Sequence, residues 1–277
     1  MIEQVTDLPA LPQAGLKLMR LMEDPDGNAH DVVKVVETDP TLSAKLLRIC
    51  NSAAFGVRQR VNSVEQAVFV RGFAEVQRLA VALSFGRVMS KPLDGCGHGE
   101  TFWMHSLLVA FGAESLARSA AQFKNDSSAA YTAGLLHDIG KLVLDSALND
   151  ELRGAIHDMI ESDGCSRVHA EKCVLGLDHA DVGASLLEKW QLPACLVEAV
   201  RNHHRPVCKP EPMLSAFVHI ANCMAHQSDA APGGGGSTSE ADEDAIASVG
   251  IDAEGCKRAL LAVREQAETA SDFAVTA

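Results

Sequence analysis

The sequence predicts an all-α protein, a multi-helical bundle with an N-terminal helical part, and three observations support this fold class. Aromatic residues make up only 4% of the 277-residue chain, although 47% of it is hydrophobic. The apolar residues are chiefly Ala, Leu and Val at helical spacing, which argues against a β-sandwich or barrel. The first 90 residues contain no strand-like alternation of useful length. A chain of this size can bury a substantial core, as one large domain or two smaller ones.

Local signals predict the first three helices in order. Apolar residues at 16–22 predict a helix that ends at the turn sequence 24–27. Valines at 32–36 predict a short second helix. The pair Asp39-Pro40 predicts an N-cap followed by proline at the first position of a third helix, which runs to about residue 51.

Two more helices complete the N-terminal part. Ser63 and Gln66 have the spacing of a capping box before a fourth helix, and a longer amphipathic helix covers 73–89. The Gly-rich residues that follow, 91–100, predict a connection. We therefore predict that residues 1–95 form the N-terminal helical part.

Residues 96–230 predict a helical core. Its expected helices cover 101–122, 128–146, 150–162, 179–190, 193–204 and 212–227. Asp178 and Asp181 frame the start of the helix at 179. Residues 231–241 predict a flexible Gly-rich surface loop without a phosphate-binding role, and 242–277 predict a short helix followed by a longer one.

The charge of the chain limits its partners. The net charge is −13, and no cluster of Lys and Arg is visible, so we expect no nucleic acid partner. A small phosphorylated ligand in a local pocket remains compatible with this charge, because a metal ion or a few cations can offset its own.

Cysteine usage and the N-terminal residues indicate the compartment. The eight cysteines include no CxxC pair, which favours free thiols in the core over disulfides, with a soft zinc site at Cys173 or Cys223 as the alternative. The N-terminus has no basic region followed by an apolar run, and no stretch is long enough to span a bilayer. These features predict a cytoplasmic location and no membrane partner.

A set of polar residues on the predicted helices could bind metal. Its members are His105, His137, Asp138, His179, His203, His204 and Asn222. On a helix, adjacent His137 and Asp138 project about 100° apart and can both reach one cavity. Imidazole and carboxylate groups suit one or two divalent ions of Fe, Mn, Zn or Mg.

The remaining histidines are predicted to have other roles. His30, His98, His157 and His169 fit hydrogen-bonded core positions or helix ends. His219 and His226 share a helix face with Asn222, and this spacing fits a polar seam as well as a site.

Four sequence elements occur in a characteristic order. They are FWMHS around His105, GLLHDIGK around His137 and Asp138, HADVGASLL from His179, and LPACLVEAV shortly before His203-His204. Together they resemble the HD superfamily of phosphohydrolases. The first hundred residues contain LPALPQAGLKLMRLMEDPDG, TDPTLSAKLLRICNSAAFG and VNSVEQAVFVRGFAEVQRL, which resemble the N-terminal part of HDOD domains. The resemblance to this bacterial family covers roughly residues 5–228.

The resemblance implies roles for individual residues. It assigns one metal to His105, His137, Asp138 and position 222, where this chain has Asn in place of the Asp of catalytic members. A neutral amide binds metal less strongly. It assigns a second metal to three histidines, His179, His203 and His204.

Lys141 and the residues after His204 bear on catalysis. Lys141 could hold a phosphate oxygen, or it could be an exposed lysine paired with Asp138 or Asp145. HD-GYP cyclic di-GMP phosphodiesterases, which are relatives of HDOD proteins, carry a GYP element after the paired His. Here residues 205–207 read Arg-Pro-Val, so that substrate is not supported.

Three functions follow from the resemblance. The favoured one is a signal-transduction output domain that works through signalling proteins, with a pocket that binds metal or a small ligand. The alternative is a metal-dependent phosphohydrolase of a nucleotide or other phosphoester, with Asp138 and Lys141 as catalytic residues. The third is an iron-based redox site, supported only by the His-rich ligand set.

Overall fold

The computed structural model describes residues 13–23, 27–52, 60–89, 99–120, 127–206, 214–227 and 241–251, together with 255 and 259. Within these residues every regular element is an α-helix, which confirms the all-α prediction. No helix in these ranges is long and apolar enough to cross a membrane. Most residues of the Gly-rich connection, of the loop at 231–241 and of the long C-terminal helix lie outside the described residues, so the predicted domain boundaries remain predictions.

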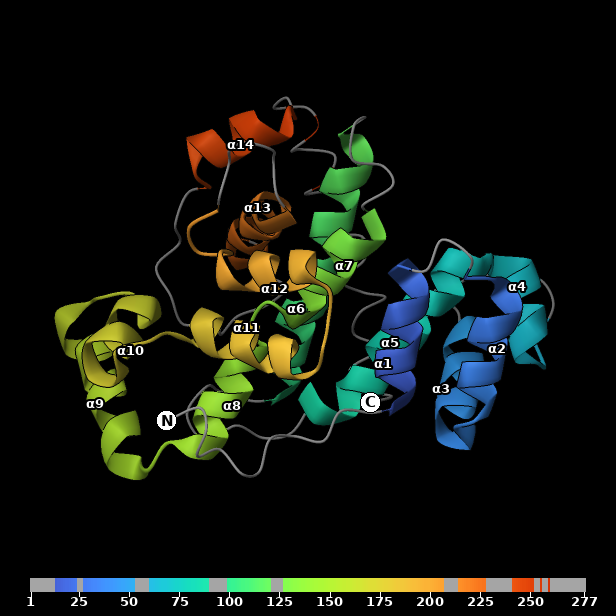
Figure 1. Ribbon diagram of the computed structural model, residues 1–277, viewed down its shortest axis with the longest axis horizontal. Coiled ribbons are helices and arrows are strands. Elements are labelled where there is room, and N and C mark those ends of the chain that lie inside the picture. Colours follow the sequence, from blue (N-terminus) through green and yellow to red (C-terminus); the bar gives the residue numbers. More distant parts are fainter. Residues whose placement is uncertain are drawn as a thin grey trace.

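The N-terminal helices lie together on one side of the molecule (Figure 1). They are α1 (Gln13–Glu23), α2 (Ala29–Glu37), α3 (Pro40–Cys50), α4 (Val64–Arg71) and α5 (Phe73–Met89). Asp39 caps α3 as predicted, because its Oδ1 accepts hydrogen bonds from the backbone N–H groups of Thr41 and Leu42.

The predicted capping box at α4 is only half formed. The hydroxyl of Ser63 accepts from the backbone N–H of Gln66, as the motif requires. The Gln66 side chain, however, accepts from the backbone N–H of Asn62, one residue before the cap. The helix therefore begins where the sequence indicates, with a different reciprocal bond.

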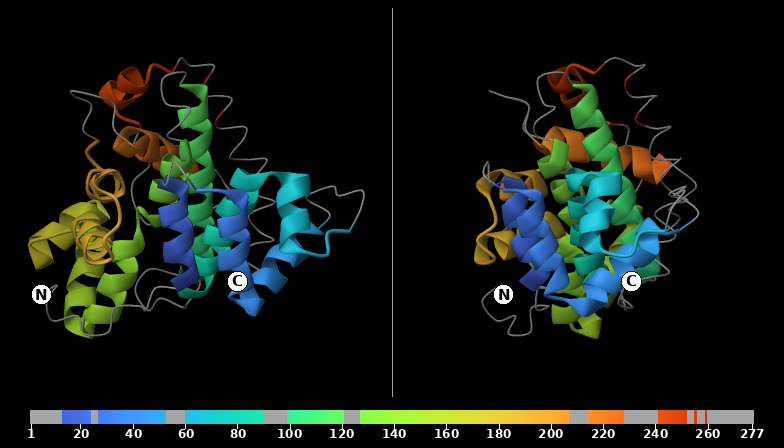
Figure 2. Two further views of the ribbon diagram at one scale, coloured as in Figure 1. Left: turned by 45° about the vertical axis from the view of Figure 1, so that its right-hand side comes forward. Right: turned by 90° about the vertical axis from the view of Figure 1, so that its right-hand side faces the viewer.

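The remaining helices form the other part of the fold. They are α6 (Gly99–Ser119), α7 (Ser127–Leu136), α8 (Ile139–Ala147), α9 (Asp150–Asp163), α10 (Arg167–Leu175), α11 (His179–Lys189), α12 (Ala194–Arg201), α13 (Leu214–Gln227) and α14 (Glu243–Val249). Helix α6 packs against α7 and α13, and α11 packs against α8 and α12. The hairpin of α9 and α10 lies at the edge opposite α1–α5, as the views in Figures 1 and 2 agree.

Three helix predictions for this part were wrong. The single helix expected at 128–146 is two helices, α7 and α8, interrupted at residues 137–138. The helix expected at 193–204 ends at Arg201, so the paired histidines lie in a turn. Helix α10 was not predicted at all, because its sequence RVHAEKCVL has no apolar stripe at helical spacing.

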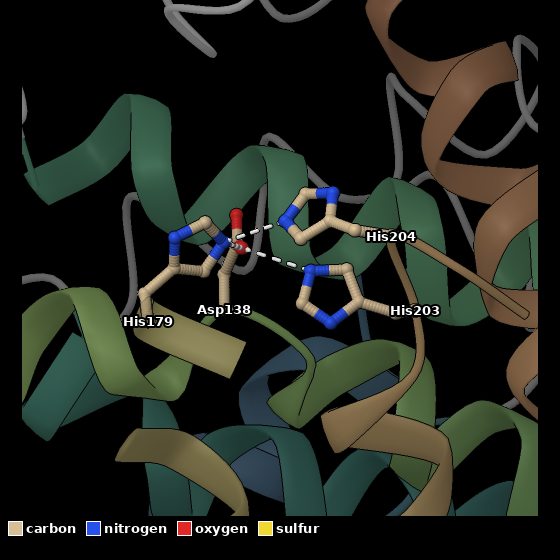
Figure 3. A group of neighbouring side chains, drawn as sticks. All are labelled: Asp138, His179, His203 and His204. Carbon is tan, nitrogen blue, oxygen red and sulfur yellow. Dashed lines mark hydrogen bonds and ion pairs between the residues drawn. The ribbon is translucent and has the colours of Figure 1, made fainter. Parts of the chain in front are cut away.

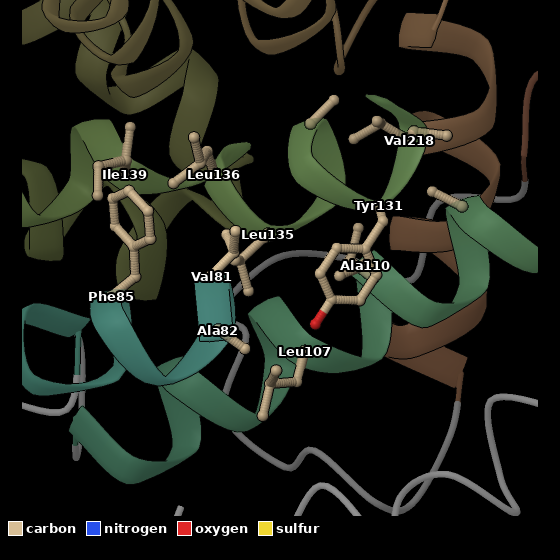
Figure 4. Close-up of a cluster of buried hydrophobic side chains, with 14 of the residues drawn as sticks. Val81, Ala82, Phe85, Leu107, Ala110, Tyr131, Leu135, Leu136, Ile139 and Val218 are labelled. Atoms are coloured by element: carbon tan, nitrogen blue, oxygen red, sulfur yellow. The ribbon is translucent and has the colours of Figure 1, made fainter. Parts of the chain in front are cut away.

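The two parts share buried apolar contacts. Figure 4 shows Val81 and Phe85 of α5 beside Leu135 and Leu136 of α7 and Ile139 of α8. A buried ion-pair cluster joins α5 to α6, since the guanidinium of Arg78 on α5 contacts Glu75 on its own helix and Glu114 on α6. This packing holds α6 and α7 in fixed positions beside the candidate site.

Glycine allows one especially close approach next to that site. A Cβ on Gly140 would lie 2.7 Å from the backbone nitrogen of Gly183 and even closer to the carbonyl oxygen of His179. Because real Cβ atoms do not approach backbone this closely, the start of α8 contacts α11 backbone to backbone. This contact sets the separation between Asp138 and His179.

Candidate metal centre

His137 and Asp138 lie in the turn between α7 and α8, not on a helix as the sequence predicted. Asp138 is the N-cap residue of α8, with φ −97° and ψ 6°, but its side chain makes no capping hydrogen bond. The carboxylate is therefore available to the pocket. The break in the helix positions both side chains of the motif, so the expectation of two directions 100° apart on one helix was wrong.

Asp138 lies at the centre of two groups of histidines. Its Oδ2 is 3.2 Å from Nε2 of His137 and 3.8 Å from Nε2 of His105 on α6. Its Oδ1 is 3.2 Å from Nε2 of His179 and 3.7 Å from Nε2 of His203. Figure 3 shows the second group, in which His179, His203 and His204 surround the carboxylate. The structure thus brings together six of the seven predicted metal residues.

Backbone hydrogen bonds fix the orientation of two imidazoles. Nδ1 of His137 lies 2.8 Å from the carbonyl oxygen of Gly134, and Nδ1 of His203 lies 2.7 Å from that of Val200. Since a carbonyl only accepts, each Nδ1 carries the proton and donates it. In the neutral ring of His203 the lone pair of Nε2 then points toward Asp138, which is the tautomer that a metal ligand needs.

Glu171 on α10 is a site residue that the sequence analysis missed. This fully buried carboxylate lies 2.6 Å from Nδ1 of His179 and accepts from the backbone N–H of His179 at 2.8 Å. Arg167 donates to its other oxygen at 2.7 Å. Burial acts to raise the pKa of Glu171, but His179 and Arg167 outweigh burial and lower that pKa to about 2. The only sequence signal was the i, i+4 pair of Arg167 and Glu171.

The ionisation states favour a cation in the pocket. Burial, together with neighbouring histidines, lowers the pKa values of His105, His203 and His204, which leaves these rings neutral. Burial acts to raise the pKa of Asp138, yet His137 and Lys141 hold it well below its ordinary value. Burial acts to lower the pKa of His179, but Glu171 and Asp138 outweigh burial and raise that pKa. The three neutral imidazoles and the ionised carboxylate are donor groups that transition metals bind.

Several buried donor atoms of this site have no hydrogen-bond partner among the described residues. They are both ring nitrogens of His105, Nε2 of His137 and of His203, and Oδ1 of Asp138. On α13, the buried Oδ1 of Asn222 also has no partner in the described part of the chain. Buried polar atoms without partners are costly, and they are rare in folded proteins. A cation among them would satisfy several at once, so the residues present fit a bound metal.

Helix α13 covers the pocket with three polar residues one turn apart. Nδ1 of His219 donates to the carbonyl oxygen of His203 at 2.9 Å, and its Nε2 accepts from the backbone N–H of Asp242 at 3.2 Å. The ring of His226 lies 4.7 Å from that of His105. Asn222 shares this helix face. The predicted polar seam and the predicted site are therefore adjacent.

The other histidines and the cysteines lie outside the two groups. His30 and His169 lie exposed in the first turns of α2 and α10, which agrees with the predicted helix ends. His157 is exposed in the middle of α9, so that prediction was wrong, and His98 lies outside the described residues. Cys173 is also exposed, and its sulfur lies 3.5 Å from Nε2 of His169. Among the described residues, the clusters able to hold a metal contain only His and Asp, so the soft zinc alternative gains no support.

Comparison with known proteins identifies the family. The sequence model of the HDOD domain matches residues 8–206. An uncharacterized protein of Treponema pallidum (strain Nichols) is 29% identical over 223 residues, which are 79% of this chain and 42% of that protein. Ribonuclease Y of Acholeplasma laidlawii (strain PG-8A) is 26% identical over 160 residues, 58% of this chain and 23% of its own length. The chain thus spans less than half the length of these two curated relatives.

Solved structures share the fold at low sequence identity. An HDOD domain protein of unknown function from Geobacter sulfurreducens has a TM-score of 0.78 at 22% identity, covering 99% of this chain and 93% of that one. A proposed phosphohydrolase from Shewanella amazonensis SB2B has 0.75 at 24%, covering 99% and 97%. A proposed signal transduction protein from Marinobacter aquaeolei VT8 has 0.76 at 24%, covering 97% and 59%. The extent of the family match and this shared helical architecture show that the chain belongs to the HDOD domain family.

Proposed function

We propose that the protein is a cytoplasmic signal-transduction module that acts through protein partners and holds a divalent metal ion around Asp138. One observation carries the metal: buried donor atoms without hydrogen-bond partners converge on a single ionised carboxylate. The donors come from α6, the turn after α7, the start of α11 and the turn after α12. A bound ion would join these four segments, so its presence would stabilise one arrangement of the helices that partners contact.

Two features favour regulation over hydrolysis. Asn222 stands where the resemblance expects a carboxylate, so the site lacks one negative charge. The donors of the first group are also well shielded, since His105, His137 and Asp138 are each no more than 3% exposed. A hydrolytic metal must keep a position open to substrate and water.

The test measures metal content and phosphoester turnover on the same preparation of the full chain. Expression is supplemented with Fe, Mn and Zn, and Asp138→Ala is prepared in parallel. We expect bound metal in the wild type, much less in the variant, and equal, background turnover of bis-p-nitrophenyl phosphate and cyclic di-GMP in both. Metal-dependent turnover that Asp138→Ala abolishes would overturn the regulatory proposal, and an empty pocket after supplementation would overturn the metal.

A metal-dependent phosphohydrolase is the second candidate, and Lys141 favours it. Its Nζ lies 2.6 Å from Oδ2 of Asp138, and its side chain is 12% exposed, so the ammonium lies at the buried carboxylate and the side chain is not fully enclosed. When bound, a metal ion would activate water and offset phosphoryl charge. Asp138 would help hold the ion, and Lys141 would orient a phosphate oxygen. Under this function Lys141→Met loses turnover but keeps its metal, which separates it from the regulatory role.

A further inference from the structure

The groove between α1 and α2 lies among the N-terminal helices, outside the pocket around Asp138 (Figure 1). We propose that this groove binds an acidic amphipathic helix of a protein partner, whose carboxylates contact the cations of both helices. The proposal rests on the proposed function, because it gives the protein partners of that function a binding surface. The groove has a volume of about 350 Å³, and its lining residues are Lys17, Arg20, Leu21, Asp31, Lys34 and Val35.

Each helix supplies three groove residues that share one of its faces. On α1, Lys17, Arg20 and Leu21 lie at i, i+3 and i+4, and residues 31, 34 and 35 repeat this spacing on α2. The cations Lys17, Arg20 and Lys34 are exposed. Leu21 and Val35 are partly buried and pack against the core. The groove therefore has an apolar floor with cations along both sides.

The three cations of the groove have no acidic partner among the residues that the structure describes. By contrast, the exposed guanidinium of Arg118 on α6 lies 2.9 Å from Glu114. The single carboxylate of the groove, that of Asp31, accepts from Nδ2 of Asn28 at 2.7 Å. Three cations and one carboxylate give the groove a local charge of +2, in a chain whose net charge is −13. An acidic partner is therefore attracted to this groove, while the chain as a whole repels it.

The arrangement suits an elongated acidic surface better than a compact anion such as phosphate. A phosphate group is commonly held by converging donors, for example the backbone N–H groups at a helix N-terminus. At the start of α2, Oδ1 of Asn28 already accepts from the backbone N–H groups of His30 and Asp31, at 3.0 and 3.3 Å. The cations instead come from two helices with an apolar floor between them. A third helix can pack into such a groove, with its apolar residues on the floor and its carboxylates at the sides.

Helix α1 also contacts the part of the fold that carries the candidate metal centre. It packs against α5 and α7, and Oγ1 of Thr132 on α7 lies 3.6 Å from Sδ of Met22 on α1. Helix α7 ends at Leu136, directly before His137 and Asp138. A partner in the groove would thus contact a helix that packs on the segment leading to the pocket, as an output surface requires.

The experiment titrates a fluorescein-labelled peptide with the full chain and follows binding by fluorescence anisotropy. The peptide repeats Glu-Leu-Leu-Glu over about 16 residues, which is long enough for an amphipathic helix, and its counterpart has Gln in place of every Glu. We expect the acidic peptide to bind about tenfold more tightly than its counterpart, and to bind more weakly as salt is added. Equal affinity for the two peptides, or no binding of the acidic one, would overturn the proposal.

Two double variants locate the binding surface. Lys17→Gln combined with Lys34→Gln removes one cation from each side of the groove, and we expect it to weaken binding of the acidic peptide about fivefold. Arg48→Gln combined with Arg60→Gln removes the same charge from exposed residues that line a separate cavity beside α3, and should keep the wild-type affinity. Circular dichroism checks that both variants fold. An equal loss in the two variants would contradict the assignment to the groove.

Two further comparisons separate this surface from other outcomes. Inorganic tripolyphosphate that binds more tightly than the acidic peptide, and weakens in the groove variant, would assign the groove to a phosphorylated ligand and overturn the proposal. Acidic-peptide binding that is unchanged in the groove variant would place acidic partners elsewhere, so the groove would fail while partner-based signalling stands. Every titration is run with and without chelator. Absence of binding in both conditions, in protein that contains metal, would remove the groove and leave the proposed metal centre intact.

Discussion

The protein has two buried ionic clusters that differ in one respect. Arg78, Glu75 and Glu114 pair with one another across α5 and α6, and Arg118 adds a further contact to Glu114 at 2.9 Å. Around Asp138, by contrast, several buried nitrogen and oxygen atoms have no hydrogen-bond partner in the part of the chain that the structure describes. Each cluster has a buried carboxylate at its centre, Glu114 in one and Asp138 in the other. Internal pairing is what separates a cluster that holds helices together from one prepared for a ligand.

The largest expected effect on stability comes from removing one charge of the cluster around Arg78. Glu114→Gln leaves the buried guanidinium of Arg78 with one carboxylate instead of two. We expect a loss of about 3 kcal/mol in the free energy of unfolding, measured by urea denaturation. The loss should be the same with chelator and with Co²⁺, because this cluster binds no metal. Arg118→Ala, half exposed at the end of the same cluster, should cost under about 1 kcal/mol.

Metal binding at the cluster around Asp138 should have the next largest effect on the free energy of unfolding. Co²⁺ at one hundred times its dissociation constant should raise the free energy of unfolding of the wild type by about 2.7 kcal/mol, and excess chelator should reverse the gain. Asp138→Asn should show no such gain. Equal stabilisation of Asp138→Asn and wild type would mean that the ion binds elsewhere, and the contrast between the two clusters would fail.

A smaller effect is expected from the residue that orients His179. Glu171→Gln removes the charge behind the ring but keeps a similar shape, so Co²⁺ affinity should fall tenfold to a hundredfold. The visible bands should shift as well, which a purely structural defect would not produce. Glu188→Gln on α11, an exposed residue paired with Arg201, is the matched control. Unchanged affinity in Glu171→Gln would show that the hydrogen bond does not act on the metal.

The smallest expected effect is on the reactivity of Cys50, whose thiol is buried among the N-terminal helices. Burial, partly offset by Arg71, raises the pKa of the Cys50 thiol to about 11. At pH 8 roughly one thiol in a thousand would be ionised, so iodoacetamide should leave Cys50 intact and modify the exposed Cys173 and Cys195. Labelling of Cys50 should increase as the pH rises toward 11. Rapid labelling at pH 8, mapped by mass spectrometry, would show that this interior opens.

Local chemistry was the most predictable part of the fold. Asp39 and Asp178 cap helices within a few residues of themselves, and both caps were visible in the sequence. At Asp178 the structure forms the full capping box with Asp181. Such caps depend only on residues that are close in the sequence. The structure therefore confirms both predictions.

The break at His137-Asp138 could not be predicted in this way. Apolar residues continue on both sides of it, so periodicity alone indicates one helix from 128 to 146. The interruption depends on the close contact of α8 with α11, which only the folded chain provides. Glu171 was missed for a related reason. A turn that the sequence pattern does not show brings it next to its partner His179.

Because of the backbone contact at Gly140, the separation of α8 and α11 does not depend on the charges of the side chains in the pocket. Side chains do not set the separation of α8 and α11, because the two backbones touch directly. Donor exchanges at His204, Asn222 or Lys141 can therefore change which ion is preferred while the frame stays the same. For protein engineering, this offers a scaffold in which coordination chemistry can be varied one donor at a time.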